Sequence, residues 1–314
     1  MTPHTTRLAP SPTGALHLGN ARTFLINWAL ARQRGWQVLL RIEDLDTPRV
    51  KPETIAQTRD TLAWLGIDWD REVPLQSTDT VPSRNAMHAL AAAGLVYPSD
   101  LTRSQLAEAR SAPNEGDSES RFPAALRPEH RPAAFDRPEA NWRFACPERS
   151  VDVADGFAGP VRVVPSDDVG DFVVWTKRGA PAYQLAVVID DHRQGVTRVV
   201  RGDDLLPSTG RQMLLMEPLA IEPPGYIHVP LVRGSDGRRL AKRHGDTRLD
   251  AYRRRGVPAG RIVALIAGWC GMGRPKRMTA AEFAAAFRLG TMPKGDVTFS
   301  PEDDRWLLDG ARSL

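Results

Sequence analysis

Apolar residues recur at helical spacing shortly after the start of the chain. Leu25, Trp28 and Ala29 fall on one face of a helix, and Gly35 stands where that helix would end, because glycine readily adopts the left-handed backbone of a C-terminal cap. The pattern therefore predicts a helix over about 20–34.

An apolar run and a second helical pattern follow. The run at 36–42 predicts a short buried strand, and Pro52 opens a helix that ends at Gly66. The apolar face of this helix consists of Ile55, Leu62 and Leu65. Strand alternating with helix is typical of a parallel α/β sheet, in which ligands bind beyond the carboxyl ends of the strands. Residues 7–13 and Glu43 would lie at that edge.

The composition along the chain predicts three regions. A Pro- and Arg-rich stretch at 97–180, with a polar break at 111–120, is typical of a domain inserted into a sheet. The catalytic domain would then be split over 1–96 and 181–245. Residues 246–314 show an Ala/Leu periodicity that predicts a mostly helical region.

The overall composition indicates a globular protein of 314 residues, with 41% hydrophobic and 25% charged residues. The longest apolar candidate, 262–272, is about half as long as a membrane span, and the N-terminus has no apolar signal region, so we expect a cytoplasmic protein with no membrane partner. Cys146 and Cys270 are the only cysteines, which excludes a disulfide framework and a thiolate zinc cluster within the chain.

The positive charge is concentrated in one segment. Residues 233–261 carry ten Arg or Lys and three Asp, a net charge of +7, while the net charge of the whole chain is +4 and that of the remainder is therefore −3. Such an excess is expected where phosphates dock. A solvated basic helix face is the alternative interpretation.

A possible phosphate site precedes the first predicted helix, within 7–20. The start of a helix presents unpaired N–H groups, Gly19 removes side-chain bulk, and His17 can donate to a phosphate oxygen. Residues 239–243, Arg-Leu-Ala-Lys-Arg, would supply the cations that such a site needs.

Four segments together resemble the motifs of class I glutamyl-tRNA synthetases, in the same order and with compatible spacing. They are 10–20, 41–46, 200–205 and 239–243. Residues 17–20 correspond to the "HIGH" signature of that family and 239–243 to its "KMSKS" signature. The resemblance implies an α/β fold, with a Rossmann-type parallel sheet, an inserted acceptor-binding-like domain and a C-terminal helical region that resembles a stem-contact domain.

The length of the chain favours one subgroup of that family. Glutamyl-tRNA synthetases continue into an anticodon-binding domain, whereas this chain stops at Leu314 and we expect no such domain. In this it resembles the glutamyl-queuosine tRNA(Asp) synthetases, which attach glutamate to the queuosine base of tRNA(Asp). Residues 183–191, 194–197 and 201–206 are also similar to that subgroup.

For the first step, the resemblance implies attack of the α-carboxylate of L-glutamate on the α-phosphorus of ATP, with Mg²⁺-pyrophosphate leaving. His17 and Lys242 are the expected catalytic residues. The expected ATP-binding set is His17, Gly19, Asn20 and Lys242. Ala241 stands where the second signature usually has serine, which raises the alternative of a catalytically silent RNA-binding paralogue.

The resemblance also assigns five residues to L-glutamate. Arg7 and Arg201 can bind the γ-carboxylate in a bidentate manner, and Glu43 can accept the α-ammonium group. Ser11 adds a hydrogen bond and the Tyr183 hydroxyl closes the pocket.

A different interpretation of the acidic run remains open at this point. Arg41, Glu43, Asp44 and Asp46 would then form a surface ion-pair cluster without a ligand. For Asp44 and Asp46 we favour a role in loop structure over a role in chemistry.

The subgroup usually holds a zinc ion in its inserted domain, on cysteines of a Tyr-x-Cys-x-Cys-Thr-Arg pattern and on residues further along. Here the usual ligand positions hold Ser99, Leu101 and Leu126. Since none of these replaces a thiolate, we predict no structural zinc and an insert held by ordinary packing.

In the second step the adenylate would pass to a hydroxyl, either of a terminal adenosine or of queuosine, and the sequence leaves this open. A mixed anhydride needs no nucleophilic side chain. RNA contacts are expected from 233–261 and from Arg103, Arg121 and Arg127 of the insert. We expect a monomer that acts on queuosine-containing tRNA(Asp), with a truncated glutamyl-tRNA synthetase that charges tRNA(Glu) as the alternative.

Overall fold

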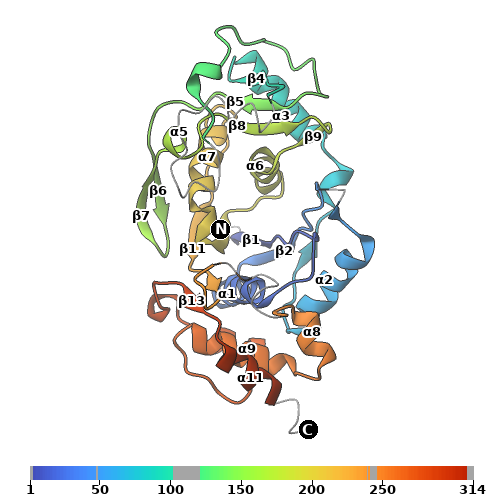
Figure 1. The fold of residues 1–314 in the computed structure, drawn as a ribbon, viewed down its shortest axis with the longest axis vertical. Coiled ribbons are helices and arrows are strands. Elements are labelled where there is room, and N and C mark those ends of the chain that lie inside the picture. Colours follow the sequence, from blue (N-terminus) through green and yellow to red (C-terminus); the bar gives the residue numbers. More distant parts are fainter. Residues whose placement is uncertain (1–2, 47–48, 102–120, 239, 241–245, 310–314) are drawn as a thin grey trace.

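The computed structural model describes residues 3–46, 49–101, 121–238, 240 and 246–309. The molecule is elongated, with antiparallel strands at one end, parallel strands in the middle and the C-terminal helices at the other end (Figure 1). Among the described residues, no helix is long and apolar enough to cross a lipid bilayer.

Parallel strands form the centre of the fold, as the alternation of strands and helices predicts. Three of them pair in the order β1 (Thr5–Leu8), β2 (Gln37–Leu40) and β3 (Arg71–Glu72). Four more strands follow in the order β10 (Arg198–Gly202), β11 (Gly225–Val229), β6 (Val151–Asp155) and β7 (Gly159–Val163). The two groups meet where β1 contacts β10 and the Thr197 amide donates to the Thr5 carbonyl at 2.9 Å.

Helices connect and cover these strands. They are α1 (Leu18–Arg34), α2 (Pro52–Trp64), α3 (Val81–Ala92), α6 (Tyr183–Arg193) and α7 (Leu206–Met216). α1 begins two residues before the predicted start because His17 caps it, and it ends as predicted at Gly35, whose φ of 62° is left-handed. The carboxyl ends of β1 and β10 thus face the start of α1, where the site lies.

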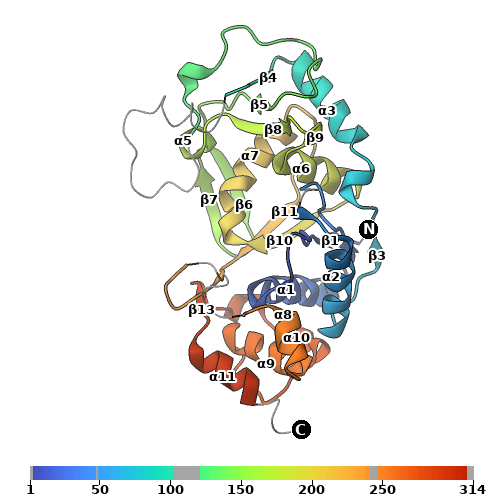
Figure 2. The ribbon, with the colours of Figure 1, turned by 45° about the vertical axis from the view of Figure 1, so that its right-hand side comes forward.

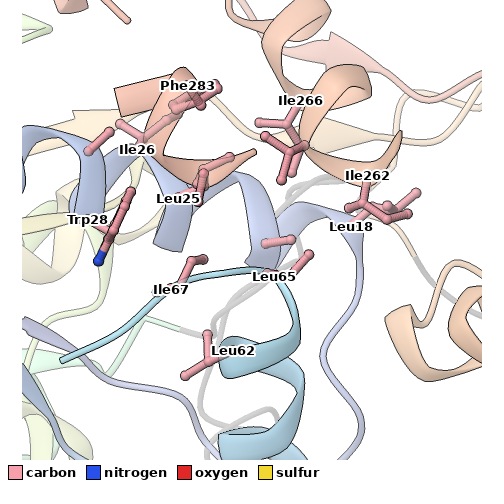
Figure 3. Close-up of a cluster of buried hydrophobic side chains, with 14 of the residues drawn as sticks. Leu18, Leu25, Ile26, Trp28, Leu62, Leu65, Ile67, Ile262, Ile266 and Phe283 are labelled. Atoms are coloured by element: carbon pink, nitrogen blue, oxygen red, sulfur yellow. The ribbon is translucent and has the colours of Figure 1, made fainter. Parts of the chain in front are cut away.

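The C-terminal region is helical, as predicted. Its helices are α8 (Leu249–Arg254), α9 (Ala259–Trp269), α10 (Ala280–Ala286) and α11 (Pro301–Asp309), and the short strands β12 (Val232–Arg233) and β13 (Val297–Thr298) pair beside them. Figure 3 shows Leu18 and Ile26 of α1 against Ile262, Ile266 and Phe283 of this region. All five side chains are fully buried, so this apolar contact fixes the start of α1 against the C-terminal helices.

The stretch 97–180 contributes to two sheets. Its antiparallel sheet has the order β4 (Val96–Pro98), β5 (Trp142–Phe144), β8 (Phe172–Thr176) and β9 (Ala180–Pro181). β6 and β7 belong to the same stretch but continue the sheet of β11, and the short helix α5 (Pro165–Asp168) follows β7 (Figure 2). Part of this stretch therefore supports the centre of the fold, and the division into domains stays a prediction.

Two of the three positions that the resemblance assigns to zinc ligands form an apolar contact here. Leu101 and Leu126 pack against the buried side chains of Tyr97 and Phe122. Ser99 is buried as well. Among the described residues, no group of three or more His, Cys, Asp or Glu could hold a metal ion. These side chains do not fit zinc, and the prediction of a zinc-free insert awaits metal analysis.

Candidate active site

A cavity of about 410 Å³ lies at the carboxyl ends of β1 and β10. It brings together seven of the nine residues predicted to bind substrate, which are Arg7, His17, Gly19, Asn20, Glu43, Tyr183 and Arg201. The cavity thus lies at the edge of the sheet where the alternation of strands and helices predicts a ligand.

The other two predicted residues have different positions. Ser11 lines a larger neighbouring cavity of about 1100 Å³, to which Glu43 and Tyr183 also belong. Lys242 lies outside the described residues, as do Arg239, Ala241 and Arg243. The signature at 239–243 is therefore described only by Leu240, which lines the smaller cavity.

Buried ion pairs hold Arg7 and Glu43, which line the amino-acid end of the smaller cavity. Asp191, at the end of α6, lies 3.1 Å from the Arg7 Nε and 2.7 Å from the Arg41 Nη1. Arg41 also lies 3.3 Å from Glu43 and donates to Gln194 at 3.0 Å. Arg41 is completely buried, so the interpretation of a surface ion-pair cluster is wrong for Arg41 and Glu43.

These pairs set the charge states of their members. Burial would raise the pKa of Asp191, but the neighbouring Arg41 and Arg7 lower it below its ordinary value. Burial would lower the pKa of Arg41, but Asp191 and Glu43 raise it instead. For Glu43 burial dominates, so its pKa is raised although Arg41 and Arg7 oppose the shift. Glu43 is thus a carboxylate that a bound ammonium group would stabilise.

Arg201 is buried without a carboxylate partner among the described residues within 4 Å. Its Nε lies 3.0 Å from the His228 Nε2, and its Nη2 donates to Thr209 at 2.7 Å and to Gln212 at 2.9 Å. Its guanidinium also lies 5.3 Å from the ring centre of Tyr226. Because all of these partners are neutral, Arg201 presents an uncompensated positive charge to the cavity.

The charges of this end complement L-glutamate. Arg7, Arg41 and Arg201 contribute three positive charges, against the carboxyl groups of Glu43 and Asp191, and Asp204 adds a further carboxyl group to the lining of the same cavity. Glutamate at neutral pH carries two carboxylates and one ammonium group, a net charge of about −1. Glutamine, with a net charge of about zero, would leave the charge of Arg201 unmatched.

His17 forms the start of α1 at the nucleotide end. Its Nδ1 accepts from the Gly19 amide at 3.1 Å and from the Asn20 amide at 3.4 Å, while the Asn20 side chain accepts from the His17 amide at 3.1 Å. An imidazole that accepts at Nδ1 carries its proton on Nε2. The cap thus fixes the tautomer that can donate to a phosphate oxygen.

The backbone amides at the start of α1, which we predicted to be unpaired, have hydrogen-bond partners in the structure. Two of them bind His17, and the amide of Leu18 donates to the Thr247 carbonyl at 3.1 Å. The expectation of unpaired backbone groups is therefore wrong for these three amides, since a histidine cap and a distant carbonyl accept their hydrogen bonds. Glycine at position 19 leaves room for the His17 ring, because a Cβ there would lie 3.0 Å from the His17 Cε1.

An apolar wall, which the sequence motifs did not predict, completes the nucleotide end. It consists of Val200, Leu231, Val232 and Leu240. Gly202 belongs to this wall, and a Cβ there would lie 2.7 Å from the Asp204 Oδ1 and 2.8 Å from the Leu231 Cδ2. Apolar side chains of this kind suit a nucleotide base. Arg41 and Asp191 are far apart in the sequence, and no local pattern indicated that they form an ion pair.

The remaining acidic residues shape loops, in line with our preference. Asp44 accepts from the amide and the hydroxyl of Ser77. Asp46 forms ion pairs with Arg49 and Arg178.

The basic stretch 233–261 is partly neutralised by its surroundings. Its ion pairs are Arg233 with Asp296, Arg248 with Asp246, Arg253 with Asp60, and Arg254 with Asp250. In the insert, Arg127 binds Asp171 and the Cys146 carbonyl, so its guanidinium has a structural role. Arg121 is exposed beside Asp167, and Arg103 lies outside the described residues.

Comparison with known proteins shows the family. The family described as tRNA synthetases class I (E and Q), catalytic domain, matches residues 4–302. A glutamyl-Q tRNA(Asp) synthetase of Rhodopirellula baltica is 46% identical over 82% of each chain, and one of Symbiobacterium thermophilum is 41% identical over 94% of this chain and 96% of the relative.

Longer relatives match over part of their length. A glutamate–tRNA ligase of Azorhizobium caulinodans is 38% identical over 84% of this chain but 56% of its own. The crystal structure of a glutamate tRNA ligase from Elizabethkingia meningosepticum, in complex with its amino acid, superposes with a TM-score of 0.78 at 25% identity, over 98% of this chain and 69% of that one. The chain thus belongs to the class I tRNA synthetases of the E and Q type and, within them, to the group of the glutamyl-Q tRNA(Asp) synthetases.

Proposed function

We propose that the protein activates L-glutamate with ATP and transfers it to the queuosine base in the anticodon of tRNA(Asp), as a monomer in the cytoplasm. The observation that carries the choice of amino acid is the buried, uncompensated Arg201 in a cavity that also holds Glu43. The acceptor is supported by the relatives of matching length, which are named glutamyl-Q tRNA(Asp) synthetases.

In the first step an α-carboxylate oxygen of glutamate attacks the α-phosphorus of ATP. The bond between the α-phosphorus and the bridging oxygen breaks, so that glutamyl-adenylate forms and pyrophosphate leaves. Mg²⁺ enters with ATP as part of the substrate. The protein contributes orientation and electrostatic stabilisation, since no covalent intermediate with a side chain is required.

Each residue at the amino-acid end has a role in this proposal. Arg201 and the terminal nitrogens of Arg7 bind the γ-carboxylate, while Glu43 binds the α-ammonium group. Ser11 and Tyr183 provide hydroxyl groups at the opening towards the larger cavity. These contacts hold the α-carboxylate towards the nucleotide end.

At the nucleotide end, His17 donates from Nε2 to a phosphate oxygen, which its Nδ1 cap makes possible. Gly19 and Asn20 keep this cap in place, and the apolar wall receives the adenine base. Lys242 is proposed to hold the phosphates in the transition state, on the motif alone.

In the second step the acceptor hydroxyl attacks the carbonyl carbon of the adenylate. The hydroxyl loses its proton, the ester forms, and AMP leaves with the electrons of the anhydride bond. The larger cavity is suited to deliver this hydroxyl, because it joins Glu43 and Tyr183 to Lys177 and Arg178 of the insert. Its cations suit a phosphate backbone next to the reacting nucleotide.

Two assays test the proposal. Glutamate-dependent exchange of labelled pyrophosphate into ATP tests activation, and a silent RNA-binding paralogue would give none. Labelled glutamate is then offered with tRNA(Asp) that carries or lacks queuosine, and the site of attachment is mapped by nuclease digestion. We expect label in the anticodon of the queuosine-containing tRNA alone.

A second candidate is the charging of tRNA(Glu) at its 3′ end, which the 38% identity to a glutamate–tRNA ligase favours. Label on the terminal adenosine of tRNA(Glu), with none on tRNA(Asp), would replace the first proposal by this one.

A further inference from the structure

A buried histidine lies directly behind Arg201. His228 is on β11, next to β10 in the parallel sheet, where Arg201 and His228 are register partners. The His228 side chain is completely buried and its Nε2 lies 3.0 Å from the Arg201 Nε. Thr209 of α7 lies 3.0 Å from the same nitrogen.

The other ring nitrogen of His228 is bound by a carboxylate of the insert. Asp155, the last residue of β6, lies 2.7 Å from the His228 Nδ1 and accepts from the His228 amide at 3.0 Å. The amides of Phe157 and Ala158 also donate to Asp155, at 2.9 and 2.7 Å. A carboxylate with this many donors stays ionised, which fits its lowered pKa: hydrogen bonds from His228 and these amides outweigh burial.

These contacts fix the protonation of His228. The ionised Asp155 can only accept a hydrogen bond, so the His228 Nδ1 carries the proton and donates it to Asp155. The His228 Nε2 is then the acceptor for the Arg201 Nε–H. Burial lowers the pKa of His228, and the nearby Arg201 lowers it further, so the ring is neutral at pH 7. The anionic Asp155 thus contacts the neutral His228, which in turn contacts the cationic Arg201.

This arrangement meets two requirements at Arg201: the guanidinium must be held in place, and its positive charge must remain available to a ligand. A carboxylate in direct contact would hold the guanidinium in place but would neutralise the charge that a ligand carboxylate needs. A neutral histidine holds the Nε, neutral Thr209 and Gln212 hold Nη2, and Nη1, which has no partner among the described residues, remains for a ligand. The two other arginines of the site, Arg7 and Arg41, have Asp191 in direct contact instead.

We propose that Asp155 and His228 are positioning residues for Arg201, and that they set the preference of the site for an amino acid with a side-chain carboxylate over its amide. The proposal rests on the proposed glutamate activation. It also assigns a role in amino-acid selection to the stretch 97–180, through Asp155 on β6.

A pair of substitutions separates positioning from packing. His228→Gln places an amide oxygen near the former Nε2 and keeps an acceptor for Arg201, whereas His228→Asn reaches only the former Nδ1 and leaves the Arg201 Nε unpaired. We expect His228→Asn to raise the KM for glutamate ~10–100-fold, as for a buried donor left without its partner. The KM for ATP and the kcat of exchange should stay within about threefold, and His228→Gln should recover most of the loss.

Asp155→Asn and a control complete the set. Asp155→Asn should raise the KM for glutamate roughly tenfold and reduce the ratio of kcat/KM for glutamate over glutamine by a similar factor. The control is Tyr97→Phe, which removes a 2.5 Å hydrogen bond to Asp171 that is also buried but remote from Arg201. It should lower thermal stability without changing either KM.

The wild-type chain provides a test that needs no variant to fold. The titratable or charged groups around His228 are Asp155 of β6, Arg201 of β10, Arg7 of β1 and Tyr226 of β11. Burial and the nearby Arg201 hold the pKa of His228 below its ordinary value, so glutamate affinity should fall only when the pH drops below the usual range of histidine and His228 becomes protonated. His228→Gln should lack this component.

The outcomes distinguish the two proposals. Absence of glutamate-dependent exchange in the wild type overturns the proposed function. Exchange in the wild type, together with equal KM values for glutamate in wild type and His228→Asn, overturns the positioning role. So does a parallel rise in the KM for glutamate and for ATP, or identical behaviour of His228→Asn and His228→Gln.

Discussion

The amino-acid end of the cavity is built from charged side chains of four separate elements, whereas the nucleotide end begins with a cap formed within four consecutive residues. Arg7 comes from β1, Arg41 directly follows β2, Asp191 belongs to α6 and Arg201 to β10. At the other end, 17–20 bind one another at the start of α1.

This difference teaches where selectivity and catalysis reside. The buried charges of the site must be balanced by the charges of the ligand, and an unbalanced buried charge costs free energy. The amino-acid end therefore discriminates strongly between a carboxylate and an amide. A donor held by a local cap needs no partner from elsewhere and acts on a phosphate, which is the same for every amino acid. We therefore expect substitutions at one end to change the KM for glutamate and those at the other end to change the rate of exchange.

The largest effect is expected at Arg201. Arg201→Gln removes the uncompensated charge and should reduce kcat/KM for glutamate by about 10²–10³·⁵, equivalent to the ~3–5 kcal/mol of a broken buried pair. Exchange kinetics at saturating ATP measure this loss. Arg198→Gln, at the start of the same strand, is the matched control and should leave the KM unchanged. An unchanged KM for Arg201→Gln would remove Arg201 from the glutamate site.

Asp191 links two arginines, so its loss should affect both binding and stability. Asp191→Asn leaves Arg7 and Arg41 without their shared carboxylate, and we expect the free energy of unfolding to fall by ~3–5 kcal/mol. Urea denaturation measures this change. Asp60→Asn, which breaks an exposed pair with Arg253, should lose no more than ~1 kcal/mol. Equal losses in the two variants would contradict the buried linkage.

His17 tests the other end. His17→Ala and His17→Asn should both slow exchange by about 10²–10³, the typical loss of one preorganised donor, while the KM for glutamate stays unchanged. Asparagine is a good helix cap, so only the alanine variant should also lose ~1 kcal/mol of stability. A large rise in the KM for glutamate in either variant would show that the two ends are not separate.

The pH dependence sharpens the comparison at Glu43. Burial raises the pKa of this carboxyl, so Glu43 takes up a proton as pH falls through that value and the α-ammonium group loses its partner. The KM for glutamate should rise with falling pH, by up to about tenfold per pH unit below the pKa, and the KM for ATP should not share this rise. In Glu43→Gln, glutamate binding should be weak and this component of the pH dependence absent.

Gly19 should give the smallest effect. In Gly19→Ala the new Cβ would lie 3.0 Å from the His17 Cε1, so the ring must shift by a few tenths of an ångström. We expect exchange to slow by about fivefold, as for ~1 kcal/mol of overpacking, with no change in the KM for glutamate. Gly14→Ala, which adds a Cβ in open space, is the control. A loss as large as that of His17→Ala would mean that Gly19 itself contacts the nucleotide.

Local pattern was sufficient for much of the fold. The predicted helix at 20–34 corresponds to α1, the apolar run at 36–42 contains β2, and Pro52 opens α2. Periodicity and caps act within one or two turns, so a single sequence displays them. The parallel order of the strands follows from their alternation with helices.

Pairing between distant residues could not be predicted in the same way. Asp191 stands 184 positions from Arg7, and Asp155 stands 73 positions from His228. Neither pair leaves a spacing signal, because only the sheet brings the partners together. The amide of Leu18 is a similar case, since the Thr247 carbonyl that accepts from it comes from the C-terminal region, whereas the Gly19 and Asn20 amides bind the neighbouring His17.

The sequence by itself determined the motifs, the α/β alternation and the residue types that ATP and glutamate require. The tertiary structure decided which charges remain uncompensated. Arg7, Arg41 and Arg201 are chemically the same, yet two of them face Asp191 and the third faces a neutral His228. Charge balance in a buried site depends on distances of a few ångströms, and only the packing of β1, α6, β10 and β11 sets those distances.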